Sequence, residues 1–282
     1  MNYKVTIYIP AFNAEKTIED SIKSIQNQSL AFDEIIVVDD NSSDNTNEIV
    51  KKFHNIKLIK NSKNMGLGFN RNLAIKNSKN EIVAGIDADV VLDKFWLENI
   101  LKTFEKDEII MTGGKMIEKN FNNKFNSWRS RYYSQNWGDK NILNPPFLYG
   151  CNTIQNKFIW NKINGYDEKM LTNGEDIDYS KKIKQHNNFK LFYCPGAICH
   201  HLQDDNLESL SNRVWRYHSF GYKIKQPSFY RFVKLSLKQF KFLMQRFLEN
   251  LIKLNFYYIY ISFQIFLKFI SLELKNYLSN KK

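Results

Sequence analysis

The chain has 282 residues, enough for a substantial hydrophobic core without disulfides or a structural metal. Its three cysteines, Cys151, Cys194 and Cys199, show no metal-binding spacing and leave an odd thiol, which suits a reducing compartment and argues against a disulfide framework. The net charge of +12 is unevenly placed, because residues 1–206 contain 27 basic and 26 acidic side chains whereas residues 207–282 contain 14 and 3.

The first hundred residues alternate between strand-like and helix-like segments. Residues 5–9 are an apolar run ended by Pro10, which predicts a buried first strand and no cleavable signal, so we expect the protein to begin in the cytoplasm. Asn13 is the predicted cap of a helix that places Ile18, Ile22 and Ile25 on one face. The next elements expected are a strand at 35–38, a helix around Ile49 capped by Ser43 or Asp44, a strand at 56–59, a helix near Leu73 and a strand at 81–86.

This alternation predicts a mostly parallel α/β sheet flanked by helices, with ligands bound at the carboxyl ends of the strands. Periodicity weakens over residues 120–146, a loop-like stretch rich in aromatic residues and asparagine. Two interpretations of it stay open, a segment that shapes a substrate cleft and a surface excursion anchored by a few aromatic rings.

Acidic residues follow two of the predicted strands. Asp39, Asp40 and Asn41 come directly after the strand at 35–38, where they can contact a ligand or cap the next helix. Asp87 and Asp89 follow the strand at 81–86, and two carboxylates at this spacing can hold a Mg²⁺ or Mn²⁺ that bridges a diphosphate. A turn without a ligand is the alternative for the second pair.

A third acidic cluster precedes a predicted helix at 179–185. Glu175, Asp176 and Asp178 favour the positive end of the helix dipole, but three acids in four residues exceed what capping needs. One of them could act as a general base that removes a proton from an acceptor hydroxyl.

Two adjacent histidines end an extended segment. Because alternate residues of a strand share a face, His201 lies on the face of Ala197 and Cys199, and His200 points the other way. His201 is therefore the better candidate for a ligand, although a single histidine is more often a satisfied polar residue.

The C-terminal tail is basic and rich in apolar residues. Over residues 229–253 polar side chains recur every three or four positions, which predicts an amphipathic helix with a basic face. Residues 254–267 are almost entirely apolar but too few for a membrane span. We expect this region to lie in a membrane interface; an ordinary helical subdomain is the alternative, and nucleic acid is not expected.

Together these residues resemble glycosyltransferase family 2 across roughly the first 200 positions. The resemblance rests on residues 5–10 with Phe12 and Asn13, the run from Val38 to Thr46, Asn64 with Gly66, Arg71 with Asn72, the Asp87 and Asp89 pair, and Gly165 to Glu168 through Glu175 and Asp176. A dinucleotide-dependent oxidoreductase is disfavoured, because Gly66 and Gly68 lack the third glycine of its phosphate loop.

The resemblance implies a GT-A fold and an inverting transfer from a nucleotide sugar. In it Asp39 would contact the uracil or thymine edge and Arg71 would lie near the base or phosphates. The implied donor-binding residues are Pro10, Ala11, Asp39, Asn41, Arg71, Asp87 and Ala88. The implied metal ligands are Asp89, His201 and Asp87, with His200 as the alternative, and the implied catalytic base is Asp176, with Glu175 as the fallback.

We therefore expect an inverting, Mn²⁺- or Mg²⁺-dependent glycosyltransferase that uses a nucleoside-diphosphate sugar, with UDP favoured, and a glycan or lipid-linked glycan acceptor, as in cell-surface polysaccharide biosynthesis. The expected domains are a catalytic domain at 1–206, made of a donor half at 1–95 and an acceptor half at 96–206, and a membrane-associating region at 207–282. The expected location is cytoplasmic, on the inner face of the cytoplasmic membrane. A catalytically idle, membrane-associated nucleotide-sugar or glycan-binding protein of the same fold is the alternative.

Overall fold

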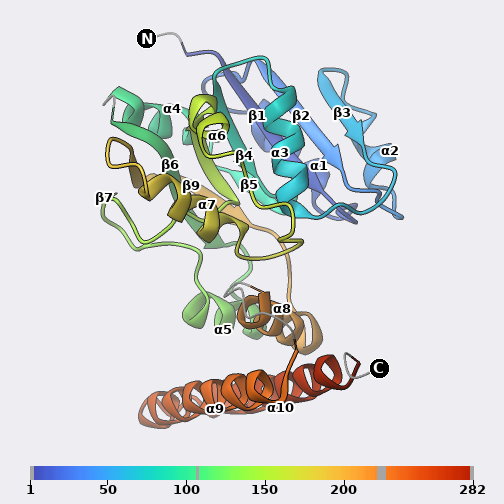
Figure 1. The fold of residues 1–282 in the computed structure, drawn as a ribbon, viewed down its shortest axis with the longest axis vertical. Coiled ribbons are helices and arrows are strands. Elements are labelled where there is room, and N and C mark those ends of the chain that lie inside the picture. The colour runs from blue at the N-terminus through green and yellow to red at the C-terminus, as the bar shows by residue number, and fades with distance from the viewer. Residues whose placement is uncertain (1–2, 106–107, 221–226, 280–282) are drawn as a thin grey trace. The chain divides into compact units, whose positions relative to one another are not determined.

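The computed structural model describes residues 3–105, 108–220 and 227–279 (Figure 1). Residues 221–226 and 280–282 of the predicted tail lie outside this range. The chain divides into two compact units: unit 1 comprises residues 1–119 and 134–203, and unit 2 comprises residues 120–133 and 204–282. The segment 120–133 thus belongs to the same unit as the C-terminal helices.

The first part of unit 1 alternates strands and helices. Its elements are β1 (Val5–Ala11), α1 (Ile18–Gln26), β2 (Glu34–Asp39), α2 (Thr46–Val50), β3 (Ile56–Lys60), α3 (Leu67–Asn77) and β4 (Ile82–Ile86). Strand β1 lies between β2 and β4, β3 pairs with β2, and all of these pairings are parallel. The predicted α/β alternation is confirmed.

The second part of unit 1 extends the same sheet in a mixed direction. Its elements are β5 (Val90–Leu92), α4 (Trp96–Leu101), a 3₁₀ turn (Lys102–Glu105), β6 (Ile109–Glu118), β7 (Ile142–Leu143), β8 (Asn152–Asn156), α6 (Lys157–Lys162), α7 (Glu175–Lys184) and β9 (Lys190–His201). Within the described residues the strand order is β3-β2-β1-β4-β8-β6-β9-β5, with β7 beside β9. Antiparallel β8 joins the parallel half to β6, and β6 and β9 are again parallel.

Two hydrophobic clusters cover the opposite faces of this sheet. Side chains alternate along a strand, so Ile7 and Ile9 pack in one cluster while Tyr8 between them packs in the other. The first cluster includes Ile18, Ile22 and Ile25, the three isoleucines predicted to share a face of α1. The second contains apolar residues of α3, α6 and α7. Because both faces are covered by helices (Figure 1), the carboxyl edge of the strands is left for ligands.

Unit 2 is helical. It consists of α5 (Lys124–Tyr132), α8 (Leu207–Phe220), α9 (Phe229–Ile252) and α10 (Phe256–Ser279). The fully buried Trp128 of α5 packs with Leu210, Ile261 and Phe269, and its indole N–H donates to Ser262 Oγ at 2.9 Å. Helices α9 and α10 lie side by side along their length (Figure 1). None of the described helices combines the length and apolar character that crossing a bilayer requires.

Three sequence predictions about local structure are wrong. Neither Ser43 nor Asp44 is the N-cap of α2: that position is Asn45, whose side chain makes no capping hydrogen bond, although Asp44 Oδ1 accepts from the backbone N–H of Thr46 at 3.0 Å. Asn13 does not cap α1: its backbone has a positive φ of 49°, its Oδ1 accepts from the backbone N–H of Ser43 at 2.9 Å, and the helix begins after Thr17. The loop-like stretch contains helix α5, because the side chain of Asn123 caps its first turn and Trp128 anchors it in the core of unit 2.

Candidate active site

The carboxyl ends of three neighbouring parallel strands define the site. Strands β1, β2 and β4 end at Ala11, Asp39 and Ile86, and Ala11 is directly paired with Asp39. Parallel strands end at the same edge of a sheet, so Asp39 and Asp87 lie at one edge, as the sequence predicted. Ala88, between Asp87 and Asp89, packs into the hydrophobic core. This keeps both acids at the carboxyl edge of the sheet.

Asp40 organises the loop that leads into α3. Its carboxylate accepts from the backbone N–H groups of Met65 at 2.8 Å and Gly66 at 2.9 Å, and from Asn61 Nδ2 at 2.8 Å. Gly66 has a φ of +86°, and a Cβ there would lie 2.8 Å from the Cα of Leu171, so only glycine fits. These contacts fix the start of α3.

Asp39 is fully buried. Its Oδ1 accepts from the backbone N–H of Ser42 at 3.1 Å and its Oδ2 from Asn47 Nδ2 at 2.9 Å, while Asn41 adopts a positive φ of 63°. In this arrangement the side chain shapes the turn after β2. The contacts of Asp39, Asn41, Pro10 and Ala11 with a nucleotide stay predictions.

Arg71, from α3, lies at the centre of an acidic cluster. Its Nη2 donates to Asp87 Oδ1 at 2.8 Å, its Nη1 donates to the carbonyl of Gly150 at 2.7 Å, and its Nε lies 3.6 Å from Glu175 Oε1. The arginine is 1% exposed. Arg71 therefore connects Asp87 with Glu175, two acids that are far apart in the sequence. Its contact with a nucleotide base or phosphate stays a prediction.

Burial raises the pKa values of the acids around Arg71. The pKa of Glu175 rises to about 8, because burial and the neighbouring charge of Asp176 outweigh Arg71. Burial also raises the pKa of Asp87, against the lowering effect of Arg71. One guanidinium is too little positive charge for this group of carboxylates, so the cluster favours a proton or another cation.

Asp176 lies beside Arg71, and both side chains approach the Cα of Gly150. Its Oδ2 accepts from the backbone N–H of Gly150 at 3.2 Å and its Oδ1 from that of Ile177 at 2.7 Å. Burial raises its pKa although these two hydrogen bonds lower it. A Cβ on Gly150 would lie 3.0 Å from Arg71 Nη2 and 3.3 Å from Asp176 Cβ, so the glycine lets the two side chains approach.

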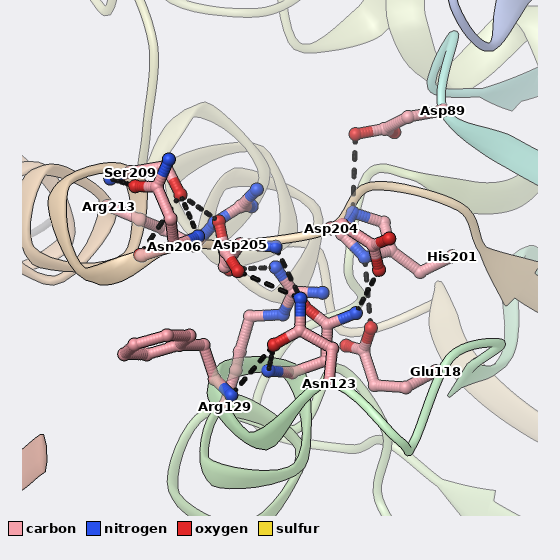
Figure 2. Close-up of polar contacts among 12 residues, drawn as sticks. Asp89, Glu118, Asn123, Arg129, His201, Asp204, Asp205, Asn206, Ser209 and Arg213 are labelled. Carbon is pink, nitrogen blue, oxygen red and sulfur yellow. Dashed lines mark hydrogen bonds and ion pairs between the residues drawn. The ribbon is translucent and has the colours of Figure 1, made fainter.

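His201 lies between two carboxylates (Figure 2). Its Nε2 is 3.2 Å from Asp89 Oδ2, and its Nδ1 is 3.1 Å from Glu118 Oε2. His200, on the other face of β9, instead pairs with Asp93 at 2.9 Å. The strand alternation predicted from the sequence thus places His201 next to Asp89.

His201 Nε2 and Asp89 Oδ2 have the spacing of two ligands of one divalent ion. Two ligand atoms in adjacent positions around an ion at about 2.1 Å are separated by roughly 3 Å, close to the 3.2 Å between His201 Nε2 and Asp89 Oδ2. Asp87 accepts a hydrogen bond from Arg71 through Oδ1, and its predicted role as a metal ligand stays a prediction. In the described part of the chain no group of three or more histidine, cysteine, aspartate and glutamate side chains could hold a metal.

Two residues of this site, Glu118 and Gly150, were not among those predicted from the sequence. Glu118 ends strand β6 and is the register partner of His201 on β9. An acid at the end of a fourth strand was the sequence signal that could have identified it. Gly150 gave no signal, because its role depends on side chains that come close only in the fold.

Comparison with known proteins identifies the family. Residues 6–172, more than half of the chain, match the model of glycosyl transferase family 2. The chain belongs to this family, as the sequence motifs indicated.

The curated relatives match different fractions of this chain. The chain is 26% identical to poly-beta-1,6-N-acetyl-D-glucosamine synthase of Staphylococcus epidermidis, over 93% of this chain and 65% of that protein. It is 39% identical to an Escherichia coli UDP-Glc:alpha-D-GlcNAc-diphosphoundecaprenol beta-1,3-glucosyltransferase, over 36% of this chain and 39% of that one. The chain spans less than two thirds of the length of these relatives.

Two solved structures share the fold at low sequence identity. A mannosyltransferase of Pyrobaculum calidifontis in complex with GDP-Man and Mn²⁺ matches with a TM-score of 0.61 and 18% identity, over 82% of this chain and 64% of that one. TarS of S. aureus in complex with UDP-GlcNAc matches with a TM-score of 0.58 and 20% identity, over 76% of this chain and 64% of that one. The predicted GT-A fold is confirmed.

Proposed function

We propose that this protein is an inverting glycosyltransferase that moves a sugar from a nucleoside-diphosphate donor to a hydroxyl of a glycan or lipid-linked glycan. The observation that supports it best is the convergence of Asp87 and Asp176 on Arg71 at the carboxyl edge of the sheet. Family membership agrees with it, and one relative is named for a UDP-Glc donor and a diphosphoundecaprenol-linked acceptor. UDP is the proposed nucleotide, with GDP as the competitor to be tested, since one similar structure contains GDP-Man.

The proposed chemistry is a single in-line displacement. Asp176 takes the proton of the acceptor hydroxyl on Oδ2, the oxygen with the longer hydrogen bond. The raised pKa of Asp176 makes it a stronger base than an ordinary aspartate, and such a base contributes about 10²–10⁴-fold in rate. The acceptor oxygen forms the new bond to the anomeric carbon while the bond to the leaving diphosphate breaks. Glu175, almost fully buried and with a pKa of about 8, is less suited to this role.

Asp89 and His201 are the proposed protein ligands of a Mn²⁺ or Mg²⁺. A divalent ion held by these two residues would supply positive charge that balances the leaving diphosphate. Asp87 is held beside this position by Arg71, where it can accept a hydrogen bond from the donor ribose. In this proposal Asp87 and Asp89 act on the donor, and Asp176 acts on the acceptor.

Two substitutions test this assignment with the full-length chain. Asp176→Asn should reduce transfer about 10²–10⁴-fold and leave donor binding unchanged. Asp89→Ala should reduce transfer and abolish the Mn²⁺-dependent thermal stabilisation by UDP-sugars. Asp93→Asn is the matched control, since Asp93 pairs with His200 on the other face of β9, and it should retain both properties. Full transfer activity in Asp176→Asn would contradict the role of the base; binding of the donor by an inactive wild type would favour the idle-protein alternative.

The surface of α9 and α10 supports a proposal about location. Helix α9 buries a narrow stripe that includes Leu235, Gln239, Leu243 and Asn250 and exposes most of its apolar side chains. Exposed large apolar residues on the two helices and their connection are Phe229, Tyr230, Leu237, Phe240, Met244, Phe247, Leu248, Leu251, Ile252, Leu254, Phe256, Tyr257, Tyr260, Phe263, Leu267, Leu274 and Leu278. This concentration is far above what a water-exposed surface normally contains.

The basic residues on the same helix indicate which partner covers this surface. Lys234, Lys241 and Lys253 of the α9 region are exposed among the apolar side chains. Apolar rings with interspersed lysines are typical of helices that lie in the headgroup layer of anionic bilayers. We therefore propose that the protein lies on the inner face of the cytoplasmic membrane as a peripheral protein, where it would meet a lipid-linked acceptor.

Co-sedimentation with vesicles tests the location. The full chain should bind phosphatidylglycerol-containing vesicles more tightly than phosphatidylcholine vesicles, and binding should weaken with salt. The double variant Lys234→Glu with Lys241→Glu should bind vesicles more weakly than the wild type. The control Lys16→Glu with Lys63→Glu, an equal charge change in unit 1, should bind them like the wild type. Absence of vesicle binding, or a stable dimer that excludes vesicles, would refute the membrane proposal.

A further inference from the structure

Glu118 is a buried acid at the end of β6 that the proposed chemistry does not use. Its side chain is 8% exposed, and its Oε2 lies 3.1 Å from Nδ1 of His201. Burying a carboxylate is unfavourable unless it is paired, so its place beside the histidine calls for a physical reason.

The sheet fixes the geometry of this pair. Glu118 and His201 are register partners on the parallel strands β6 and β9, and His201 is the register partner of Val90 on β5. The backbone N–H of Lys119 donates to the carbonyl of His201 at 3.2 Å. The histidine is thus held between two strands, and the imidazole ring is 3% exposed.

The two carboxylates lie on opposite sides of the imidazole ring (Figure 2). The nitrogens of an imidazole point in different directions, so Glu118 on the Nδ1 side does not reach an ion on the Nε2 side, where Asp89 lies. A histidine that binds a metal through Nε2 is neutral and carries its proton on Nδ1, and an acceptor at Nδ1 fixes that tautomer and the ring orientation. Glu118 is that acceptor.

We infer that Glu118 is a positioning residue for the metal site: it holds His201 with Nδ1 protonated and Nε2 turned toward Asp89. This inference rests on the proposed function, because that function requires a divalent ion at Asp89 and His201. Outer carboxylates of this kind raise the affinity of a histidine site for its metal, and their loss weakens metal binding about 10–100-fold.

The test measures metal binding directly. MnCl₂ is titrated into the full-length protein in the presence of UDP, and in a parallel series with GDP, and free Mn²⁺ is followed by its paramagnetic resonance signal. Glu118→Gln should weaken Mn²⁺ binding about 10–100-fold while the affinity for nucleotide without metal stays unchanged. A general structural defect would lower both affinities. His200→Ala, on the opposite face of the same strand, is the matched control and should bind Mn²⁺ like the wild type.

The outcomes separate the two proposals. If the wild type binds Mn²⁺ and Glu118→Gln binds it equally well, the role of Glu118 is overturned and the metal site stands. If the wild type binds no Mn²⁺ with either nucleotide, the metal site of the proposed function fails, and the role of Glu118 fails with it. Should Glu118→Gln not fold, Glu118→Asp keeps the charge but draws the carboxylate back, and wild-type Mn²⁺ affinity in that variant would overturn the inference.

Discussion

Glu175→Gln should change how the stability of unit 1 depends on pH. The pKa of Glu175 rises from an ordinary 4.5 to about 8 in the folded protein, mainly because the side chain is buried. The folded state therefore binds a proton that the unfolded state has lost, so the stability that Glu175 contributes is fully present below pH 4.5 and is lost as the pH rises through about 8. The slope is about 1.4 kcal/mol per pH unit, or roughly 3 kcal/mol between pH 5 and pH 8.

Glutamine resembles the protonated acid and does not titrate. The variant should therefore lack this loss, so its free energy of unfolding relative to the wild type should grow by roughly 3 kcal/mol over that range. Urea denaturation followed by circular dichroism at several pH values measures the difference. Glu48→Gln is the control, because Glu48 is an exposed partner of Lys51 and its pKa is lowered. A difference between wild type and Glu175→Gln that stays constant or shrinks with rising pH would refute the buried, protonated glutamate.

Three further predictions follow from the same site and the helix beside it. Gly150→Ala places a Cβ 3.0 Å from Arg71 Nη2, so turnover should fall at least about 10-fold with the circular dichroism spectrum retained; unchanged turnover would contradict the packing argument. Turnover should rise with pH along an acidic limb whose apparent pKa lies above the ordinary 3.8 of an aspartate, because Asp176 must lose its proton; a pH–rate profile that is flat down to pH 4 would exclude this. Gly68→Ala brings a Cβ to 2.6 Å from the carbonyl of Asp167, which should lower the free energy of unfolding by about 1–3 kcal/mol in urea denaturation, and a neutral effect would show that the loop can yield.

Much of unit 1 could be predicted because its local signals agree with its packing. Ile18, Ile22 and Ile25 recur at helical spacing and are all buried in α1. Asp39 and Asp87 come directly after apolar strands, and parallel strands bring their ends to one edge. In these places short-range pattern and tertiary structure give the same answer.

The parts that could not be predicted depend on long-range contacts. Helix α5 is held by Trp128, whose partners Ile261 and Phe269 come more than a hundred positions later in the chain. The burial of Arg71 depends on Asp87 and on Gly150, neither of which is its neighbour in sequence. A pattern within a short window does not contain such information.

The exposed apolar side of α9 was also not evident from its periodicity. Polar residues at regular spacing predicted the helix, and the helix is present, but Gln239 and Asn250 lie on its buried side while Phe240 is half exposed. The amide of Asn250 donates to the hydroxyl of Tyr132 at 2.6 Å, which compensates for its burial. Amphipathic spacing predicts a helix, but it does not tell which side of the helix faces water, the protein core or a membrane.

Arg71 links the chemistry of the protein to its folding. Arginine keeps its charge at every pH at which a protein stays folded, so this guanidinium needs its acidic neighbours for as long as α3 is docked on the sheet. Any substitution that loosens α3 would draw Arg71 away from Asp87 and Glu175 and leave these acids without their cation. Natural variants of this protein that work at low temperature should therefore gain their flexibility in surface loops and keep the packing around α3 unchanged.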